Sequence, residues 1–181
     1  ASIKFNEDGS IHNYEIIEAI IKPKYQLTYE DANEILELEP KEEIELVEIK
    51  NILEKSIKFR KKQGAIIFES PNSKIKLYKD KVILNKLDKT ISQTLVAESM
   101  IIMGYVTSLF INKYNLAAAY RIQKLNCNPS EILNRYNDSE IKYIILKQYM
   151  GRSYITTKPG NHESLGLKMY VQCTSPLRRY L

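Results

Sequence analysis

Apolar residues recur along this chain at helical spacing in five stretches. The first begins with Thr28 as an N-cap and Asp31 three positions later, and the second carries Ile44, Val47, Leu53 and Ile57 at helical spacing. Pro129-Ser130 and Asp138 supply start signals for the last two. The pattern therefore predicts five helices, over roughly residues 29–39, 41–63, 91–112, 129–136 and 138–149.

Other segments alternate or are rich in β-branched and aromatic residues, with turn residues between them. Lys74-Ile75-Lys76-Leu77 alternates as a half-exposed strand does. Extended segments are predicted at 2–6, 11–21, 65–69, 73–78, 81–85 and 153–157. Helices and strands do not alternate as βαβ units, which favours the α+β class, a mixed or antiparallel sheet with several packed helices.

Glu98 stands out within the most hydrophobic of these stretches. It is the only charged residue between Lys89 and Lys113. A buried carboxylate must find partners or shift its pKa upward, because burial disfavours the charged form. It either pairs with a core arginine such as Arg121 or Arg178 and orders the fold, or it serves a functional site.

Composition narrows the class of protein. The 181 residues are enough for one domain, and no uninterrupted apolar run reaches the ~18 residues of a membrane helix. Two distant cysteines give no disulfide framework, and two histidines make a histidine metal site improbable. We expect a reduced, cytoplasmic location without membrane attachment.

Charge is unevenly distributed along the chain. The net charge is +5, but residues 1–50 hold 13 acidic and 5 basic side chains, whereas residues 51–181 hold 9 acidic and 22 basic. A basic surface attracts phosphate backbones. Most of the scattered lysines, such as Lys58 and Lys61, are better explained as a solvated helix face.

The last stretch combines groups that suit a nucleic acid. Arg178 and Arg179 lie between Tyr170 and Tyr180, after the hydroxyls of Thr174 and Ser175. Arginine forks bind phosphates bidentately, and aromatic rings stack on bases. Taken alone, such a string is more often an ordinary turn with a salt-bridged helix start.

The order of these residues resembles the signature of the RNB family, the processive 3′→5′ hydrolytic exoribonucleases typified by ribonuclease II and ribonuclease R. The resemblance lies in His162-x-x-Leu165-Gly166-Leu167 followed by Tyr170-x-x-x-Thr174-Ser175-Pro176-Leu177-Arg178-Arg179-Tyr180. Upstream segments match in the family's order: Leu27-Thr28-Tyr29-Glu30-Asp31-Ala32-Asn33, Gly64-Ala65-Ile66-Ile67-Phe68, Leu95-Val96-Ala97-Glu98-Ser99-Met100 and Ala119-Tyr120-Arg121-Ile122-Gln123. It covers nearly the whole chain.

The resemblance implies roles for several residues. Arg178 would fix the scissile phosphate, and Glu98 would lie by the catalytic centre, although this chain has Ala97-Glu98 where the family often has two glutamates. Tyr29 would help to set the length of the end product, unless it only packs on the helix it begins. Phe68, by pattern a core residue, would stack on terminal bases. RNA contacts would also come from Arg179, Tyr170, Thr174, Ser175 and Arg121, although Arg121 and Gln123 are more often scaffold residues. His162 is interpreted as structural.

The resemblance also implies a cofactor that these residues do not supply. The family's aspartate cluster holds magnesium, and no Asp-x-Asp-Asp-like string occurs here. We therefore expect residues 1–181 to be one incomplete domain, the later part of an RNB catalytic domain, inactive alone. The complete protein would be a monomer acting on the 3′ end of single-stranded RNA. A non-catalytic RNA-binding or interaction module on the same scaffold is the alternative, and a basic helical interaction protein is a third.

Overall fold

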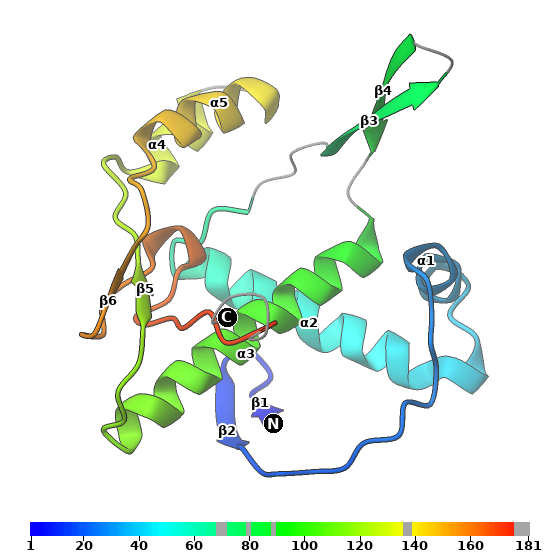
Figure 1. Ribbon diagram of the computed structural model, residues 1–181, viewed down its shortest axis with the longest axis horizontal. Helices are drawn as coiled ribbons and strands as arrows, with labels where there is room; N and C mark the ends of the chain where they lie inside the picture. Colours follow the sequence, from blue (N-terminus) through cyan, green and yellow to red (C-terminus); the bar gives the residue numbers. More distant parts are fainter. Residues whose placement is uncertain (68–71, 79–80, 88–89, 136–138, 176–181) are drawn as a thin grey trace.

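The computed structural model describes residues 1–67, 72–78, 81–87, 90–135 and 139–175. Its elements follow one another as a hairpin, two helices, a second hairpin, one long helix and a C-terminal part of short pieces (Figure 1). In chain order they are β1 (Ser2–Phe5), β2 (Ile11–Glu15), α1 (Tyr29–Leu38), η1 (Lys41–Glu43), α2 (Ile44–Lys62), β3 (Asn72–Tyr78), β4 (Lys81–Leu87), α3 (Ile91–Lys113), β5 (Tyr120–Ile122), α4 (Pro129–Arg135), α5 (Ser139–Tyr149), β6 (Tyr154–Thr156) and η2 (Glu163–Leu165).

The long helix α3 occupies the centre of the molecule, and both α1 and α2 pack against it (Figure 1). Leu53 of α2 meets Ile102 and Val106 of α3 in a buried cluster. Side chains of the β1–β2 hairpin, among them Ile3 and Phe5, close this cluster. Each fully buried aliphatic side chain stabilises the fold by roughly 1.5–3 kcal/mol, so this contact fixes the two helices on each other.

Capping boxes begin both α1 and α3. At α1 the Thr28 hydroxyl accepts from the Asp31 N–H while the Asp31 carboxylate accepts from the Thr28 N–H, which confirms the predicted cap. Thr90 and Gln93 form the same reciprocal pair at α3. Each box satisfies helix donors that would otherwise lack partners.

The described strands pair as three separate two-stranded antiparallel sheets: β1 with β2, β3 with β4, and β5 with β6. The β3–β4 hairpin projects away from the helices at the upper right of Figure 1, with Asn72 opposite Leu87 and Tyr78 opposite Lys81. The predicted α+β class is confirmed, with these two-stranded sheets in place of one larger sheet.

Two of the predicted strands are wrong in extent. The segment predicted over 11–21 ends as a strand at Glu15. Residues 65–67 form no strand, and the remainder of that prediction, 68–69, lies outside the described residues. The difference has a local cause, because the Ile66 N–H pairs with the Ser164 carbonyl of an irregular turn rather than with a strand.

By length and mean hydropathy, 1.6 over its most apolar window, α3 would also pass as a membrane-spanning helix. The prediction from sequence considered uninterrupted apolar runs, and Glu98 and the hydroxyl residues interrupt this one. The mean hydropathy of the window stays high because these few polar residues are averaged with many apolar ones. Central helices of globular domains pass the same test. Here α3 carries a buried ion pair and the packed helices α1 and α2.

Candidate functional site

A tight turn opens the C-terminal motif. The His162 N–H donates to the Leu167 carbonyl at 2.8 Å, and η2 lies between them. Gly166 has φ 65°, and a Cβ there would lie 2.8 Å from the Arg60 carbonyl oxygen and 2.9 Å from the Ala65 nitrogen. Only glycine meets both requirements, so the turn presses directly on the end of α2.

After the turn, the motif lies against α3. The Val171 N–H donates to the Gly104 carbonyl at 3.3 Å, and a Cβ on Gly104 would come within 2.5 Å of the Val171 carbonyl oxygen. The Arg121 N–H, from β5, donates to the Tyr170 carbonyl at 2.9 Å. The segment that precedes the arginine pair is therefore held between α3 and β5.

Tyr170 itself points inward. Its side chain is 8% exposed, and its ring meets that of His162 edge to face with centroids 5.5 Å apart. This arrangement packs the ring within the protein. The predicted role of Tyr170 in RNA binding stays a prediction. In the structure its ring packs against the ring of His162 and stabilises the motif.

Thr174 and Ser175 close the described part of the motif. Ser175 is exposed and has φ 56°, while Thr174 is half-buried. Thr174 borders a hollow of about 390 Å³ that α1, α2 and α3 also line, with Leu36, Leu53 and Met100 among the lining residues. The motif thus reaches the same hollow as the helix that begins at Tyr29.

Tyr29 lies at the first position of α1 with its side chain 45% exposed. Its carbonyl accepts from the Ser92 hydroxyl at 3.1 Å, and the Ser92 N–H donates to the Asn33 side chain at 3.0 Å. These bonds join the starts of α1 and α3. The predicted role of Tyr29 in setting the length of the end product stays a prediction.

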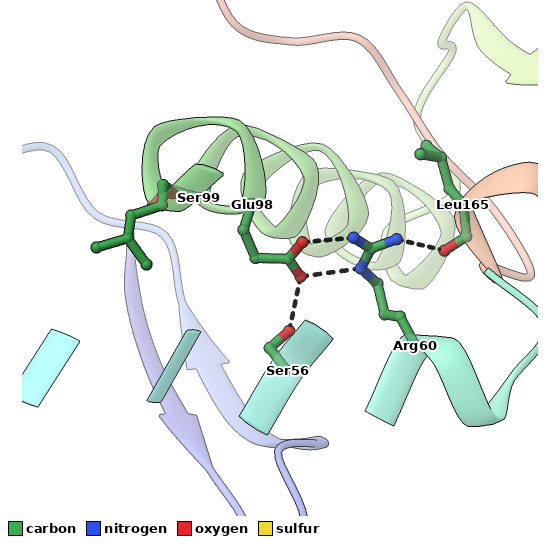
Figure 2. Close-up of polar contacts among 6 residues, drawn as sticks. Ser56, Arg60, Glu98, Ser99 and Leu165 are labelled. Carbon is green, nitrogen blue, oxygen red and sulfur yellow. Dashed lines mark hydrogen bonds and ion pairs between the residues drawn. The ribbon is translucent and has the colours of Figure 1, made fainter. Parts of the chain in front are cut away.

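Glu98 finds its partners inside the protein. Its carboxylate accepts from the Arg60 guanidinium through Nε at 2.9 Å and through Nη2, and from the Ser56 hydroxyl at 3.0 Å (Figure 2). Glu98 is 3% exposed and Arg60 5%. The remaining fork nitrogen, Arg60 Nη1, donates to the Leu165 carbonyl at 2.7 Å.

This ion pair supports the structural alternative offered for Glu98, but with a different partner. The pairing with Arg121 is wrong, because the Arg121 guanidinium donates to Ser153 and to Gln172 instead. Sequence reasoning missed Arg60 because it read the neighbouring lysines as one solvated face. The signal was its spacing from Leu53 and Ser56, which places it on the buried side of α2.

A second polar group surrounds the start of the motif. The Ser164 hydroxyl donates to the Gln123 side-chain oxygen and lies 3.3 Å from His162 Nδ1. Gln123 in turn donates to the Gly151 carbonyl at 2.8 Å. Burial, with the nearby Arg121 charge, lowers the pKa of His162 from 6.5 to about 4. The structural role assigned to His162 agrees with these contacts, as does the scaffold alternative for Gln123 and Arg121.

Three of the predicted site residues, Phe68, Arg178 and Arg179, lie outside the described residues. The segments that lead to them are described. Residues 64–67 run beside the 162–167 turn, through the Ile66 to Ser164 bond of 2.9 Å. The structure therefore brings the approach to Phe68 and the start of the arginine-bearing motif to the same place.

Comparison with known proteins gives one consistent result. The model of the RNB domain matches residues 1–181. An uncharacterized ribonuclease of Synechocystis is 35% identical over 180 residues, 98% of this chain and 27% of that protein. Ribonuclease II, chloroplastic/mitochondrial, of Arabidopsis thaliana is 29% identical over 99% of this chain and 23% of its own length. The chain thus spans about a quarter of these curated relatives.

The fold has solved counterparts as well. Mycoplasma genitalium RNase R in complex with ribose methylated single-stranded RNA superposes with a TM-score of 0.84 at 20% identity. The match covers 98% of this chain and 34% of that protein.

Proposed function

This chain belongs to the RNB domain family, and on that premise we propose that the protein containing it is a 3′→5′ hydrolytic exoribonuclease acting on single-stranded RNA. The observation that carries the proposal is the match of the family model to all of residues 1–181, the arginine pair included. Relatives named as ribonucleases and the fold of an RNA-bound RNase R support it. The expected products are nucleoside 5′-monophosphates, released processively by a monomer.

The chemistry assigned to this chain is binding and orientation. Arg178 would hold the scissile phosphate through its planar fork and offset the negative charge that grows during hydrolysis. Phe68 would stack on a terminal base, a contact worth about 1–3 kcal/mol that accepts any sequence. Tyr29, half exposed at the start of α1, would limit how far the RNA end advances.

We propose magnesium as the cofactor, with ligands outside this chain. Among the described residues no group of three or more His, Cys, Asp or Glu could hold a metal ion. The side chains of the described residues therefore do not fit a magnesium site. Glu98 is not a candidate ligand, because Arg60 and Ser56 already occupy its carboxylate.

The test is to replace the two arginines separately in the intact protein. We expect Arg178→Ala to reduce turnover by about 10²-fold or more, as loss of one transition-state donor does, with a modest loss of RNA affinity. Arg179→Ala removes the same charge from the adjacent position and should reduce turnover far less. Release of mononucleotides is followed on a linear RNA that is labelled uniformly along its length.

A circular RNA of the same sequence serves as the substrate control, since an exonuclease needs an end. Cleavage of the circle would contradict the proposal. Tight RNA binding with no products from the linear RNA would favour the non-catalytic module on the same scaffold. Equal loss of turnover and affinity in Arg178→Ala would reduce that residue to an anchor for substrate.

A further inference from the structure

The Arg60–Glu98 pair lies where three separate parts of the chain meet. Ser56 and Arg60 come from α2, Glu98 from α3, and the Leu165 carbonyl from the turn that opens the C-terminal motif (Figure 2). Arg60 uses its guanidinium in both directions, Nε and Nη2 toward Glu98 and Nη1 toward Leu165. One side chain therefore couples the helix pair to the motif.

The backbone around Arg60 couples a further segment to the same place. The Arg60 carbonyl accepts from the Ala65 N–H at 2.9 Å, and the next residue, Ile66, donates to the Ser164 carbonyl at 2.9 Å. Residues 64–67 lead to Phe68, and residues 162–175 lead to Arg178. The approaches to the proposed base-stacking ring and to the proposed phosphate-binding fork are thus joined side by side at Arg60.

Stability alone does not account for a charged pair at this position. Removing a carboxylate and a guanidinium from water costs several kcal/mol for each ion, and well-packed apolar residues of similar volume often give equal or higher stability. What apolar residues cannot supply is a donor for the Leu165 carbonyl. A lysine at position 60 could pair with Glu98 but lacks a second, oppositely directed donor in a rigid plane.

We propose that Arg60 and Glu98 are positioning residues, which act together to hold the 64–67 segment and the 162–167 turn in the register that the RNA site requires. Glu98 fixes the plane of the Arg60 fork, and the fork fixes the turn through Leu165. The glutamate that the sequence suggested as catalytic would then act through Arg60 without touching substrate. This inference rests on the proposed exonuclease function for its effect on turnover.

The decisive variant removes both charges at once, Arg60→Met together with Glu98→Leu, in the intact protein. No unpaired charge remains, so the melting temperature should stay close to that of the wild type. The Leu165 carbonyl loses its donor, and the turn should shift relative to α2 and α3. Small misplacements of reacting groups cost up to about 10²-fold in rate, so kcat for single-stranded RNA should fall by that order while KM changes much less.

Amide hydrogen exchange measures the position of the 162–167 turn and the 64–67 segment independently of activity. The Ile66 and Leu167 amides, which donate to Ser164 and His162, should exchange at least about tenfold faster in the double variant, because their partners lie on the released turn. Amides within α3 should exchange as in the wild type. Arg60→Lys, which keeps the charge pair but not the Leu165 contact, should show the same pattern with a smaller loss of kcat.

The outcomes separate the positioning role from a purely structural one and from the proposed function. If the double variant has the melting temperature and the kcat of the wild type, the proposal is overturned, because the pair is then not needed to position the turn. Unchanged exchange at Ile66 and Leu167 overturns it as well. If the wild-type protein itself releases no nucleotides, the proposed function fails, and the exchange data alone decide whether Arg60 and Glu98 hold the turn.

Discussion

Two buried polar groups hold the same turn, residues 162–167, and they differ in charge. On one side the Arg60–Glu98 ion pair donates to the Leu165 carbonyl. On the other side Gln123 and His162 meet the Ser164 hydroxyl, and the lowered pKa of His162, about 4, keeps this group neutral near pH 7. A single turn is therefore fixed by a charged contact and a neutral one.

The difference predicts how each side responds to damage. An ion pair buried from water is stable only while both partners are present, because the survivor of a single substitution is an uncompensated charge. A neutral hydrogen-bonded group loses less when one member is removed, since only a dipole is left without a partner. The charged side should therefore be sensitive to single substitutions and tolerant of paired ones, and the neutral side should respond to neither so strongly.

The largest effect should come from Glu98→Leu. The Arg60 guanidinium would remain 5% exposed without its carboxylate, which should destabilise this domain by about 3–5 kcal/mol. Urea titration of the intact protein measures the loss, and the matched control is the double variant with Arg60→Met. Equal destabilisation in the single and double variants would show that Glu98 contributes through packing and not through charge.

A smaller loss is expected from Ser164→Ala on the neutral side. The substitution leaves the buried Gln123 side-chain oxygen without the Ser164 donor, at a cost of about 1–3 kcal/mol. Ser99→Ala is the control, because Ser99 is exposed and its hydroxyl donates to the Leu95 carbonyl within α3, so its loss should stay within about 0.5 kcal/mol. If the loss from Ser164→Ala matched that from Glu98→Leu, the distinction between the two sides would disappear.

Local patterns predicted the elements of this molecule better than its contacts. The Thr28 cap, the helix at 91–112 and the anomaly of Glu98 follow from neighbours in sequence, and the structure confirms a cap at Thr28 and a helix at Ile91–Lys113. The partner of Glu98 lies 38 residues away on another helix. The spacing of Arg60 on α2 marks it as buried, but its contact with Glu98 depends on how α2 packs against α3.

The same reason explains the strand prediction at 65–67. Ala65, Ile66 and Ile67 form an apolar run, as a buried strand would, but the Ile66 N–H donates to the carbonyl of Ser164, about a hundred positions later in the chain and in the 162–167 turn. For the candidate site, the resemblance implied roles for Phe68 and Arg178, and the segments that lead to them, residues 64–67 and 162–175, are in backbone contact through Ile66 and Ser164. The side chains that hold these segments together could be identified only from the structure.

The smallest effect concerns the pH dependence of the neutral side. Burial, with the Arg121 charge nearby, lowers the pKa of His162 from 6.5 to about 4, so between these values the unfolded chain binds a proton that the folded protein does not. Stability therefore rises with pH across this window, and the contribution of neutral His162 is lost as pH falls from 6.5 toward 4. The slope from this residue is at most about 1.4 kcal/mol per pH unit.

His162→Gln should remove that part of the slope while carboxylate titrations continue in both proteins, so the measurement is the difference between the two stability–pH curves. His12→Gln, at an exposed position on β2, controls for the loss of a histidine as such and should leave the wild-type slope unchanged.

The Arg60–Glu98 side adds no histidine to this window, which means that acid should loosen the turn first from the side of Gln123 and Ser164. Amide exchange at Leu125, whose N–H donates to the Glu163 carboxylate beside that group at 2.6 Å, should then rise before exchange at Ala65. The reverse order would show that acid releases the turn from the ion-paired side, and the contrast between a charged and a neutral hold would be lost.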